Sequence, residues 1–300
     1  MSDSPLMLYV PGLRAKPPPP VHRRELFRCL VEGVRRIDAQ AAVAIQQQES
    51  CFDVVSWTYD FYGKHRDIEL DLPAIGRLLQ QPEATQEDIR QAVSLKRRAL
   101  RWLYHLADYL PFLVPQLADE RLELHLRDLR RYVHNEFEVA DAIRRLVSLP
   151  LRAAAKAGRP ILLIGHSMGS VIGYEALWQM SRDSDEDVRV DLFLTMGSPL
   201  GQRTIQRGLK GSKDRGVSRY PRNIRRWVNI AAFGELTAID MTLRNDFAGM
   251  IEAGLVDEIE DHAVFNYYRA DGELNVHAEY GYLINKACAT QICNWWRANV

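Results

Sequence analysis

A serine between two glycines stands where an apolar strand pattern gives way to a helix pattern, in the motif Gly165-His166-Ser167-Met168-Gly169. A serine hydroxyl attacks an acyl carbon only when a base removes its proton and nearby donors stabilise the oxyanion that forms. A sharp turn from strand to helix would raise Ser167 above the sheet edge, and the two glycines leave room for that turn. The turn also places the amide of Met168 at a helix N-terminus, where it can donate to an oxyanion. The motif therefore predicts a serine nucleophile.

The residues on either side of the motif supply the strand and the helix that such a turn needs. Four apolar residues, Ile161 to Ile164, precede it, and a helix-forming run from Ser170 to Met180 follows. A G-x-S-x-G pattern by itself is weak, and an ordinary glycine-rich turn is the alternative. The segment Ile161–Ser170, ILLIGHSMGS, resembles the nucleophile turn of lipases and esterases in the serine α/β-hydrolase superfamily. The resemblance implies a triad in the chain order serine, acid, histidine.

The resemblance implies a catalytic histidine on a loop after the last strand and before the final helix. Only His262 and His277 lie downstream of the motif. His277 stands shortly before the amphipathic helix expected from about Leu283 to Trp296. His262 precedes the last expected strand, Ala263 to Tyr268, and would lie at its other end. We therefore expect His277 to be the general base and His262 to be a surface residue.

The resemblance places the acid of the triad after the preceding strand, expected from Arg226 to Ile230. That strand contains a W-x-N pattern, and lipase-like relatives carry an acid eight residues after the tryptophan, in a run similar to D-P-V-A. Glu235 occupies this place, with glutamate instead of aspartate and without the proline. Asp240 is the alternative acid, since either carboxylate can orient and stabilise an imidazole.

A turn near the N-terminus is the expected source of a second oxyanion donor. Val10-Pro11-Gly12-Leu13 ends an apolar strand pattern and resembles the H-G-x turn of many lipases, with proline in place of histidine. The resemblance implies that Gly12 lets the backbone approach the substrate and that the Leu13 amide donates to the oxyanion. A tight loop without a catalytic amide is the alternative. Gly12 and the neighbouring Arg14 are candidate substrate contacts.

The rest of the chain alternates between strand and helix patterns. Strands are expected at Leu6–Val10, Phe52–Trp57 and Val190–Thr195, and a helix at Glu136–Lys156. Such alternation predicts the α/β class, with a mostly parallel central sheet and helices on both faces. The resemblance identifies this architecture as the α/β-hydrolase fold.

A leucine-rich helical block, residues 63–128, interrupts the alternation. One of its helices begins at Thr85 in a capping-box pattern, with Asp88 in the place of the usual glutamate. We expect this block to form a helical cap inserted into a hydrolase core made of residues 1–62 and 129–300.

Two segments bear on the substrate. Tyr109–Pro115 is an apolar stretch between prolines, and its Phe112 is a candidate acyl-chain contact, although a packed corner of two helices is the commoner use of such a stretch. Arg203–Arg226 carries many cations against one acid, Asp214. A basic segment near the sheet edge could contact a phosphate or an anionic membrane, and a solvated charged loop is the commoner alternative.

Composition limits the class of protein. The 39 basic and 39 acidic residues cancel, which gives no reason to expect nucleic acid as a partner. No apolar run is long enough to span a bilayer, and the N-terminus lacks the pattern of a signal peptide. The cysteines lack metal-ligand spacing and are expected to be reduced thiols of a cytoplasmic protein. The chemistry expected at Ser167 needs no metal or cofactor. Their positions are Cys29, Cys51, Cys288 and Cys293.

These expectations converge on hydrolysis of a carboxylic ester, including lipid esters, through an acyl-enzyme on Ser167. Two alternatives use the same residues differently. An acyltransferase would pass the acyl group to an alcohol instead of water, and a hydrolase-like binding protein would keep the fold without turnover.

Overall fold

The computed structural model describes residues 4–109, 127–128, 131–133, 135–183, 188–236, 238 and 240–300. Its centre is a six-stranded sheet in the order β2-β1-β3-β4-β5-β6, and every neighbouring pair in it is parallel. The predicted α/β class with a parallel sheet is confirmed. The strands are β1 (Leu6–Val10), β2 (Phe52–Val54), β3 (Ile161–His166), β4 (Val190–Met196), β5 (Ile224–Ala232) and β6 (Glu258–Val264).

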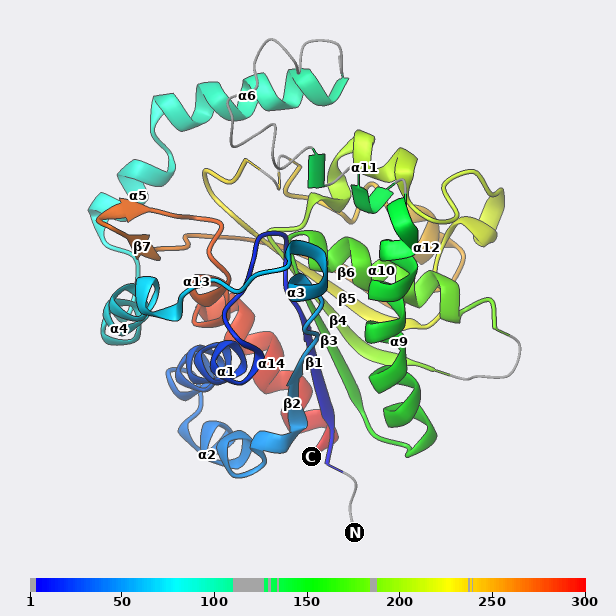
Figure 1. The fold of residues 1–300 in the computed structure, drawn as a ribbon, viewed down its shortest axis with the longest axis horizontal. Helices are drawn as coiled ribbons and strands as arrows, with labels where there is room; N and C mark the ends of the chain where they lie inside the picture. Colours follow the sequence, from blue (N-terminus) through cyan, green and yellow to red (C-terminus); the bar gives the residue numbers. More distant parts are fainter. Residues whose placement is uncertain are drawn as a thin grey trace.

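Helices cover both faces of the sheet (Figure 1). Alternate side chains of β1 enter two separate apolar clusters, because successive residues of a strand point to opposite faces. Met7 and Tyr9 join the cluster on one face, and Leu6, Leu8 and Val10 join the other. The first face carries α1 (Pro19–Arg35), α2 (Ala39–Gln47), α13 (Glu279–Leu283) and α14 (Lys286–Asn299), and the second carries α9 (Val139–Lys156) and α10 (Met168–Met180).

Shorter elements connect these layers. The α-helices are α3 (Thr58–Tyr62), α4 (Leu72–Gln80), α5 (Gln86–Ala92), α6 (Leu95–Tyr109), α11 (Arg203–Gly208) and α12 (Ala248–Glu252). The 3₁₀ turns are η1 (Glu49–Cys51), η2 (Ile68–Leu70), η4 (Glu136–Glu138), η5 (Pro199–Gly201) and η6 (Gly216–Arg219), and β7 (Arg269–Ala270) pairs antiparallel with β8 (Glu273–Leu274).

The last strand differs from the prediction. The sequence pattern placed it at Ala263–Tyr268, whereas β6 spans Glu258–Val264 and contains His262. β6 pairs only with β5 in the described sheet, so it is an edge strand. Edge strands often carry charges that discourage pairing with other chains, and the acids of β6 concealed its strand character.

The other elements lie close to their predicted positions. The final helix, expected at Leu283–Trp296, is α14 and begins at Lys286, because the Asn285 side chain caps it through the Ala287 amide; Leu283 is the last residue of α13. The strand expected at Phe52–Trp57 ends at Val54, and the helix expected from Glu136 begins at Val139.

The helical block contains the predicted capping box. The Thr85 hydroxyl accepts from the Asp88 amide at 3.2 Å, and the Asp88 carboxylate accepts from the Thr85 amide at 2.9 Å. The helix expected to begin at Thr85 is two helices in the structure, α5 and α6. Ala74, Ile75 and Leu78 of α4 pack into the apolar cluster beside α1. Phe112 lies outside the described residues, and the division into core and cap stays a prediction.

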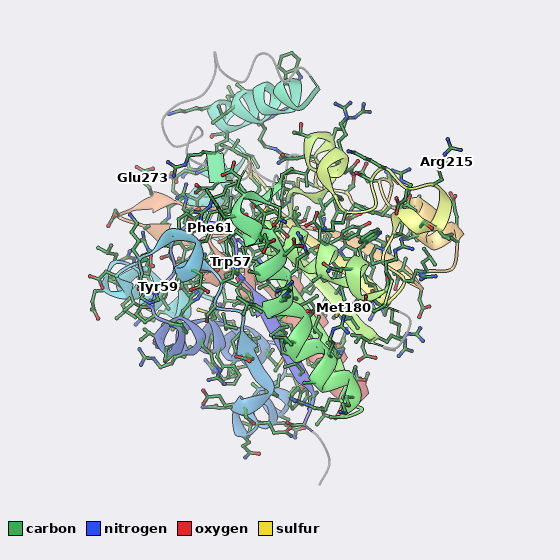
Figure 2. The ribbon with its side chains drawn as sticks, turned by 45° about the vertical axis from the view of Figure 1, so that its right-hand side comes forward. Trp57, Tyr59, Phe61, Met180, Arg215 and Glu273 are labelled. Atoms are coloured by element: carbon green, nitrogen blue, oxygen red, sulfur yellow. The ribbon has the colours of Figure 1, made fainter. Side chains whose placement is uncertain are left out.

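The basic segment Arg203–Arg226 runs over the surface through α11 and η6. Arg215 projects outward at the edge of the molecule (Figure 2). Arg226 pairs with Glu260 at 2.5 Å on the neighbouring strand. Within the described ranges, no helix is long and apolar enough to cross a membrane. The four cysteines are buried free thiols.

Candidate active site

Ser167 occupies a strained turn between β3 and α10. Its φ of 53° and ψ of −125° lie outside the regions that side-chain-bearing residues favour. The turn is held by backbone contacts: the Ser167 amide donates to the Met196 carbonyl at 2.8 Å, and the Ser167 carbonyl accepts from the Ser170 amide at 3.0 Å. The strand-to-helix geometry expected of the motif is present, and the side chain is only 3% exposed.

The glycines of the motif are required by close backbone approach. A Cβ on Gly165 would lie 2.6 Å from the Cα of Ser170. A Cβ on Gly169 would overlap the carbonyl oxygen of Val10 and lie 2.8 Å from the carbonyl oxygen of Pro11. Since real Cβ atoms do not approach backbone so closely, any side chain at either position would push the turn away from its neighbours.

His277 and Glu235 meet Ser167 as the sequence order suggested. Nε2 of His277 lies 2.9 Å from Oγ of Ser167, and Nδ1 of the same ring contacts Oε1 of Glu235. The His277 side chain is one-third exposed, whereas the Glu235 carboxylate is fully buried. The arrangement has the geometry of a general base that faces a nucleophile and is oriented by a buried acid.

The alternative candidates lie elsewhere. The carboxylate of Asp240 accepts from the backbone amide of Thr242 at 2.9 Å and from its hydroxyl at 2.8 Å. His262 lies on the edge strand β6. Its Nε2 is 3.2 Å from Oε2 of Glu260 and 3.4 Å from the side-chain amide nitrogen of Gln291. Of these candidates, His277 is the one that the fold brings to Ser167, and Glu235 is the carboxylate that contacts His277.

The turn after β1 lies directly against the serine. A Cβ on Gly12 would lie 2.8 Å from the Cβ of Ser167, so the backbone of the turn touches the nucleophile. The indole of Trp57 donates to the Pro11 carbonyl at 3.0 Å, and this bond anchors the turn. Among the hydrogen bonds of the described residues, none uses the Leu13 amide. The amide of Met168, in the first turn of α10, has no acceptor within its own helix.

Arg14 follows this turn with a left-handed backbone, φ 76°, and an exposed side chain. Its amide donates to the hydroxyl of Tyr62 at 2.9 Å, and that hydroxyl donates to the Asp128 carboxylate at 2.9 Å. The phenol thus holds the backbone beside the predicted oxyanion donor. Tyr62 belongs to no recognisable sequence motif, and only its position in the fold identifies this role.

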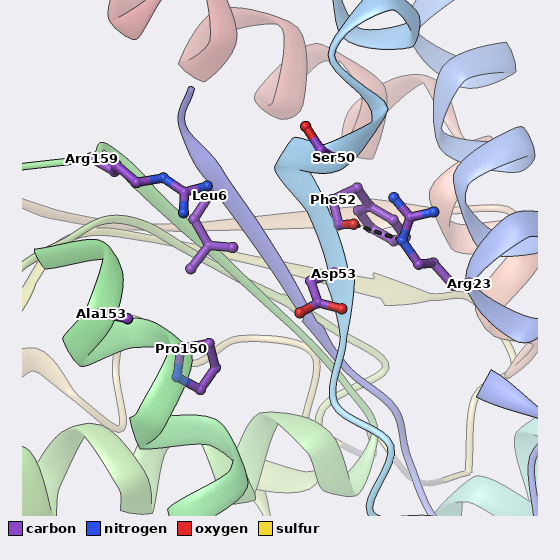
Figure 3. Close-up of a pocket in the computed structure, with 8 residues that line it drawn as sticks. All are labelled: Leu6, Arg23, Ser50, Phe52, Asp53, Pro150, Ala153 and Arg159. Atoms are coloured by element: carbon purple, nitrogen blue, oxygen red, sulfur yellow. Dashed lines mark hydrogen bonds between the residues drawn. The ribbon is translucent and has the colours of Figure 1, made fainter. Parts of the chain in front are cut away.

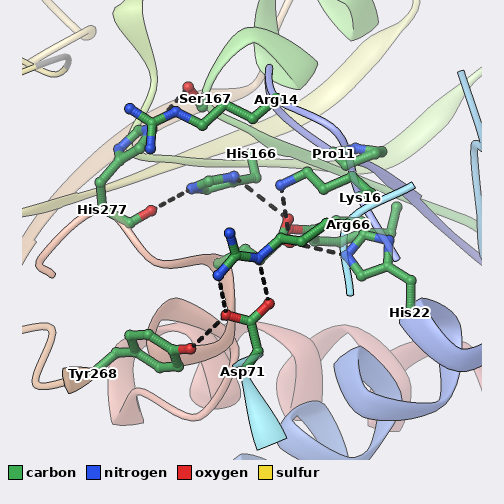
Figure 4. A network of polar contacts seen from close by, with 12 residues as sticks. Pro11, Arg14, Lys16, His22, Arg66, Asp71, His166, Ser167, Tyr268 and His277 are labelled. Atoms are coloured by element: carbon green, nitrogen blue, oxygen red, sulfur yellow. Dashed lines mark hydrogen bonds and ion pairs between the residues drawn. The ribbon is translucent and has the colours of Figure 1, made fainter. Parts of the chain in front are cut away.

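A buried carboxylate, Glu279, joins Lys16, His22 and His166 in one polar network, and Figure 4 labels these three partners. It accepts from Lys16 Nζ at 2.9 Å, from the Tyr9 hydroxyl at 3.0 Å, and contacts Nε2 of His22 at 2.9 Å. Burial raises the pKa of the Glu279 carboxyl, but Lys16 and the hydrogen bond with His22 outweigh burial and hold this pKa well below its usual range. Glu279 is therefore ionised in the interior.

His166 joins this carboxylate to the triad. Its Nε2 donates to the carbonyl of His277 at 2.9 Å, because a carbonyl can only accept, and its Nδ1 lies 3.7 Å from Glu279. Burial, followed by the charge of His277, lowers the pKa of the His166 imidazole well below its usual value. The ring is therefore neutral at pH 7 and fixes the backbone of the histidine loop.

The His166 shift predicts a pH dependence of stability. Between the lowered folded pKa and the ordinary value near 6.5, the unfolded chain binds more protons than the folded one, so the free energy of unfolding falls as the pH drops below about 6.5. One such group gives a slope of at most about 1.4 kcal/mol per pH unit. We expect His166→Gln to reduce this slope between about pH 6.5 and 5 in urea titrations. An unchanged slope would contradict a neutral buried His166.

Two residues that the sequence analysis did not single out complete the support of Glu235. The Tyr282 hydroxyl donates to Oε2 of Glu235 and accepts from the Ala232 amide at 2.9 Å. Burial, followed by the charge of Glu235, raises the pKa of Tyr282 well above its usual value, so the phenol stays a donor. Gly197, at φ 55°, leaves space for the triad, since its Cβ would lie 3.1 Å from Nδ1 of His277.

We expect Tyr282→Phe to lower kcat about 10- to 100-fold, because a hydrogen bond to a carboxylate contributes roughly 1.5–3 kcal/mol. Tyr280→Phe is the matched control: its hydroxyl is buried without a hydrogen-bond partner among the described residues. That control should keep its kcat and its unfolding free energy. Equal rates for both variants in an ester hydrolysis assay would remove the role assigned to Tyr282.

One cavity among the described residues lies away from Ser167 and His277. It measures about 270 Å³ and is lined by the first residues of β1 and β2, by α9 and by Arg159 (Figure 3). Ligands of parallel α/β sheets bind at the carboxyl ends of the strands, and this cavity lies at their amino ends. No group of His, Cys, Asp and Glu side chains in the described ranges has a metal-binding arrangement.

No family model matches this chain, and the comparisons with curated proteins and with solved structures found no match either.

Proposed function

We propose that this chain is a serine hydrolase of the α/β-hydrolase fold that cleaves a carboxylic ester through an acyl-enzyme. The observation that carries the proposal is the 2.9 Å approach of His277 Nε2 to Ser167 Oγ, with Glu235 on the other ring nitrogen. The strained backbone of Ser167 and the order serine, acid, histidine along the chain support the same assignment.

In the proposed mechanism, Oγ of Ser167 attacks the ester carbonyl carbon while His277 Nε2 takes the hydroxyl proton. The amides of Met168 and Leu13 stabilise the oxyanion of the tetrahedral intermediate. When the intermediate collapses, His277 returns the proton to the departing alcohol, and the acyl group stays on the serine. Glu235 orients the imidazole and stabilises its protonated form.

The second half of the cycle restores the enzyme. His277 removes a proton from water, the resulting hydroxide attacks the acyl carbon, and the proton then passes to Oγ of Ser167 as the carboxylic acid leaves. If an alcohol takes the place of water, the same steps transfer the acyl group. We further propose a cytoplasmic location, which the four unbridged cysteines support.

A fluorophosphonate probe, which reacts with activated serines, tests the proposal directly. We expect the wild-type protein to be labelled and Ser167→Ala to be unlabelled. Equal labelling of the two proteins, or no labelling of the wild type, would overturn it, and the second result would favour a binding protein that keeps the fold. Product analysis with a competing alcohol separates hydrolysis from acyl transfer.

A further inference from the structure

Helix α6 exposes an apolar stripe to solvent. Leu95 is 80% exposed and Trp102 is 70% exposed, and Ala99 between them is also exposed. Residues four and seven positions apart lie on one side of a helix, so these three side chains form a continuous strip. Figure 1 shows α6 across the top of the view, apart from the central sheet.

The inner side of α6 is fixed by Arg97. At about 100° per residue, Arg97 projects roughly 200° away from Leu95. Its guanidinium donates to the Leu274 carbonyl at 2.7 Å and to the Gly234 carbonyl at 3.5 Å. A Cβ on Gly234 would overlap the carbonyl oxygen of Ala92, the last residue of α5, and would lie 3.2 Å from Cδ of Arg97, so the turn at Gly234 packs against the end of α5 and the Arg97 side chain. The apolar strip therefore faces away from the rest of the protein.

Positive charge surrounds the strip. Between Asp88 and Asp108 the chain has no acidic residue, and α6 carries Lys96, Arg98 and Arg101 besides the inward-facing Arg97. Lys96 and Arg98 are exposed beside the strip. Helix α11 contacts α6 and adds the exposed Arg203 and Arg207. The whole chain has no net charge, so this positive field is local.

We infer that the outer face of α6, together with α11, binds an anionic membrane surface. An interfacial helix places leucine and tryptophan among the lipid acyl chains while lysine and arginine at its borders bind acidic headgroups. A nucleic acid would use the cations and could stack a base on Trp102, but it would leave Leu95 and Ala99 in water. The combination of strip and charge therefore selects the bilayer as the partner.

The inner side of α6, opposite the docking face, lies next to the proposed active site. Gly234, held by Arg97, immediately precedes Glu235, and Leu274 lies shortly before His277. A protein seated on a bilayer through α6 would keep the loops of its acid and its histidine close to the lipid surface. The docking face does not depend on Ser167, so it can be tested apart from catalysis.

Sedimentation with vesicles tests this inference. We expect wild-type protein to bind phosphatidylcholine vesicles that contain roughly 30% phosphatidylserine, and to bind pure phosphatidylcholine weakly. The variant Arg98→Glu/Trp102→Ser should lose about tenfold or more of the binding to the anionic vesicles. The matched control is Arg145→Glu/Leu149→Ser, an exposed cation and an exposed leucine at the same spacing on α9, and it should bind like the wild type.

Three results would overturn the inference: no wild-type binding at low salt, equal binding to both kinds of vesicle, or equal binding by the α6 and α9 variants. Two further measurements separate it from the proposed function. Ser167→Ala should bind vesicles normally, and the α6 variant should hydrolyse a soluble acetyl ester at the wild-type rate.

Discussion

Replacing Ser167 by alanine is expected to lower kcat for a p-nitrophenyl ester roughly 10⁴- to 10⁶-fold, and His277→Ala should cost about as much. In the proposed mechanism the serine supplies the attacking oxygen, and without the imidazole 2.9 Å away that oxygen would keep its proton. Because the two groups act as one unit, the double variant should be no slower than either single variant.

His262→Ala is the control for this experiment, because it removes the other downstream histidine. Its ring lies on the edge strand β6 beside Glu260, so the rate should stay at the wild-type level. Circular dichroism and the urea midpoint of each variant show whether the fold is kept. A slow His262→Ala beside an active His277→Ala would reverse the assignment of the base.

Gly169→Ala is expected to destabilise the protein by about 3 kcal/mol and to lower kcat for ester hydrolysis about 10²- to 10³-fold. The added methyl would overlap the carbonyl oxygen of Val10 and lie 2.7 Å from its carbonyl carbon. Both obstacles are backbone atoms, which cannot rotate away as a side chain would, so β1 and α10 must separate. That separation moves the proposed oxyanion amide of Leu13 away from Ser167 and removes its contribution to the rate.

Gly76→Ala is the matched control, because a Cβ at this position in α4 meets no atom within 4 Å. Alanine inside a helix is favoured over glycine, so this variant should be more stable by about 0.5–1 kcal/mol and fully active. Urea unfolding followed by tryptophan fluorescence measures both changes. A Gly169→Ala protein as stable as Gly76→Ala would mean that β1 and α10 are not packed as described.

The local sequence determined the nucleophile turn and most of the sheet. An apolar strand, two glycines around a serine and a following helix are contiguous, so their pattern depends little on the rest of the fold. β1 and the first four residues of β3 are buried and read as unbroken apolar runs, and β4 is apolar except at Asp191 and Thr195. Edge strand β6 carries charges and was misplaced for that reason.

Other features were decided only by tertiary structure. The choice between Glu235 and Asp240 depends on which carboxylate the turn after β5 aims at His277, and spacing left both open. The hydroxyl of Tyr282 reaches Glu235 across 47 positions of the chain, and Tyr9 reaches Glu279 across 270.

No short motif encodes such contacts, because each joins residues that are remote in sequence and adjacent only after the sheet and helices have packed. The chain order of serine, acid and histidine was enough to suggest a triad. The buried polar groups that hold its members in place became visible only when the layers were assembled, since burial is what makes each of those hydrogen bonds necessary.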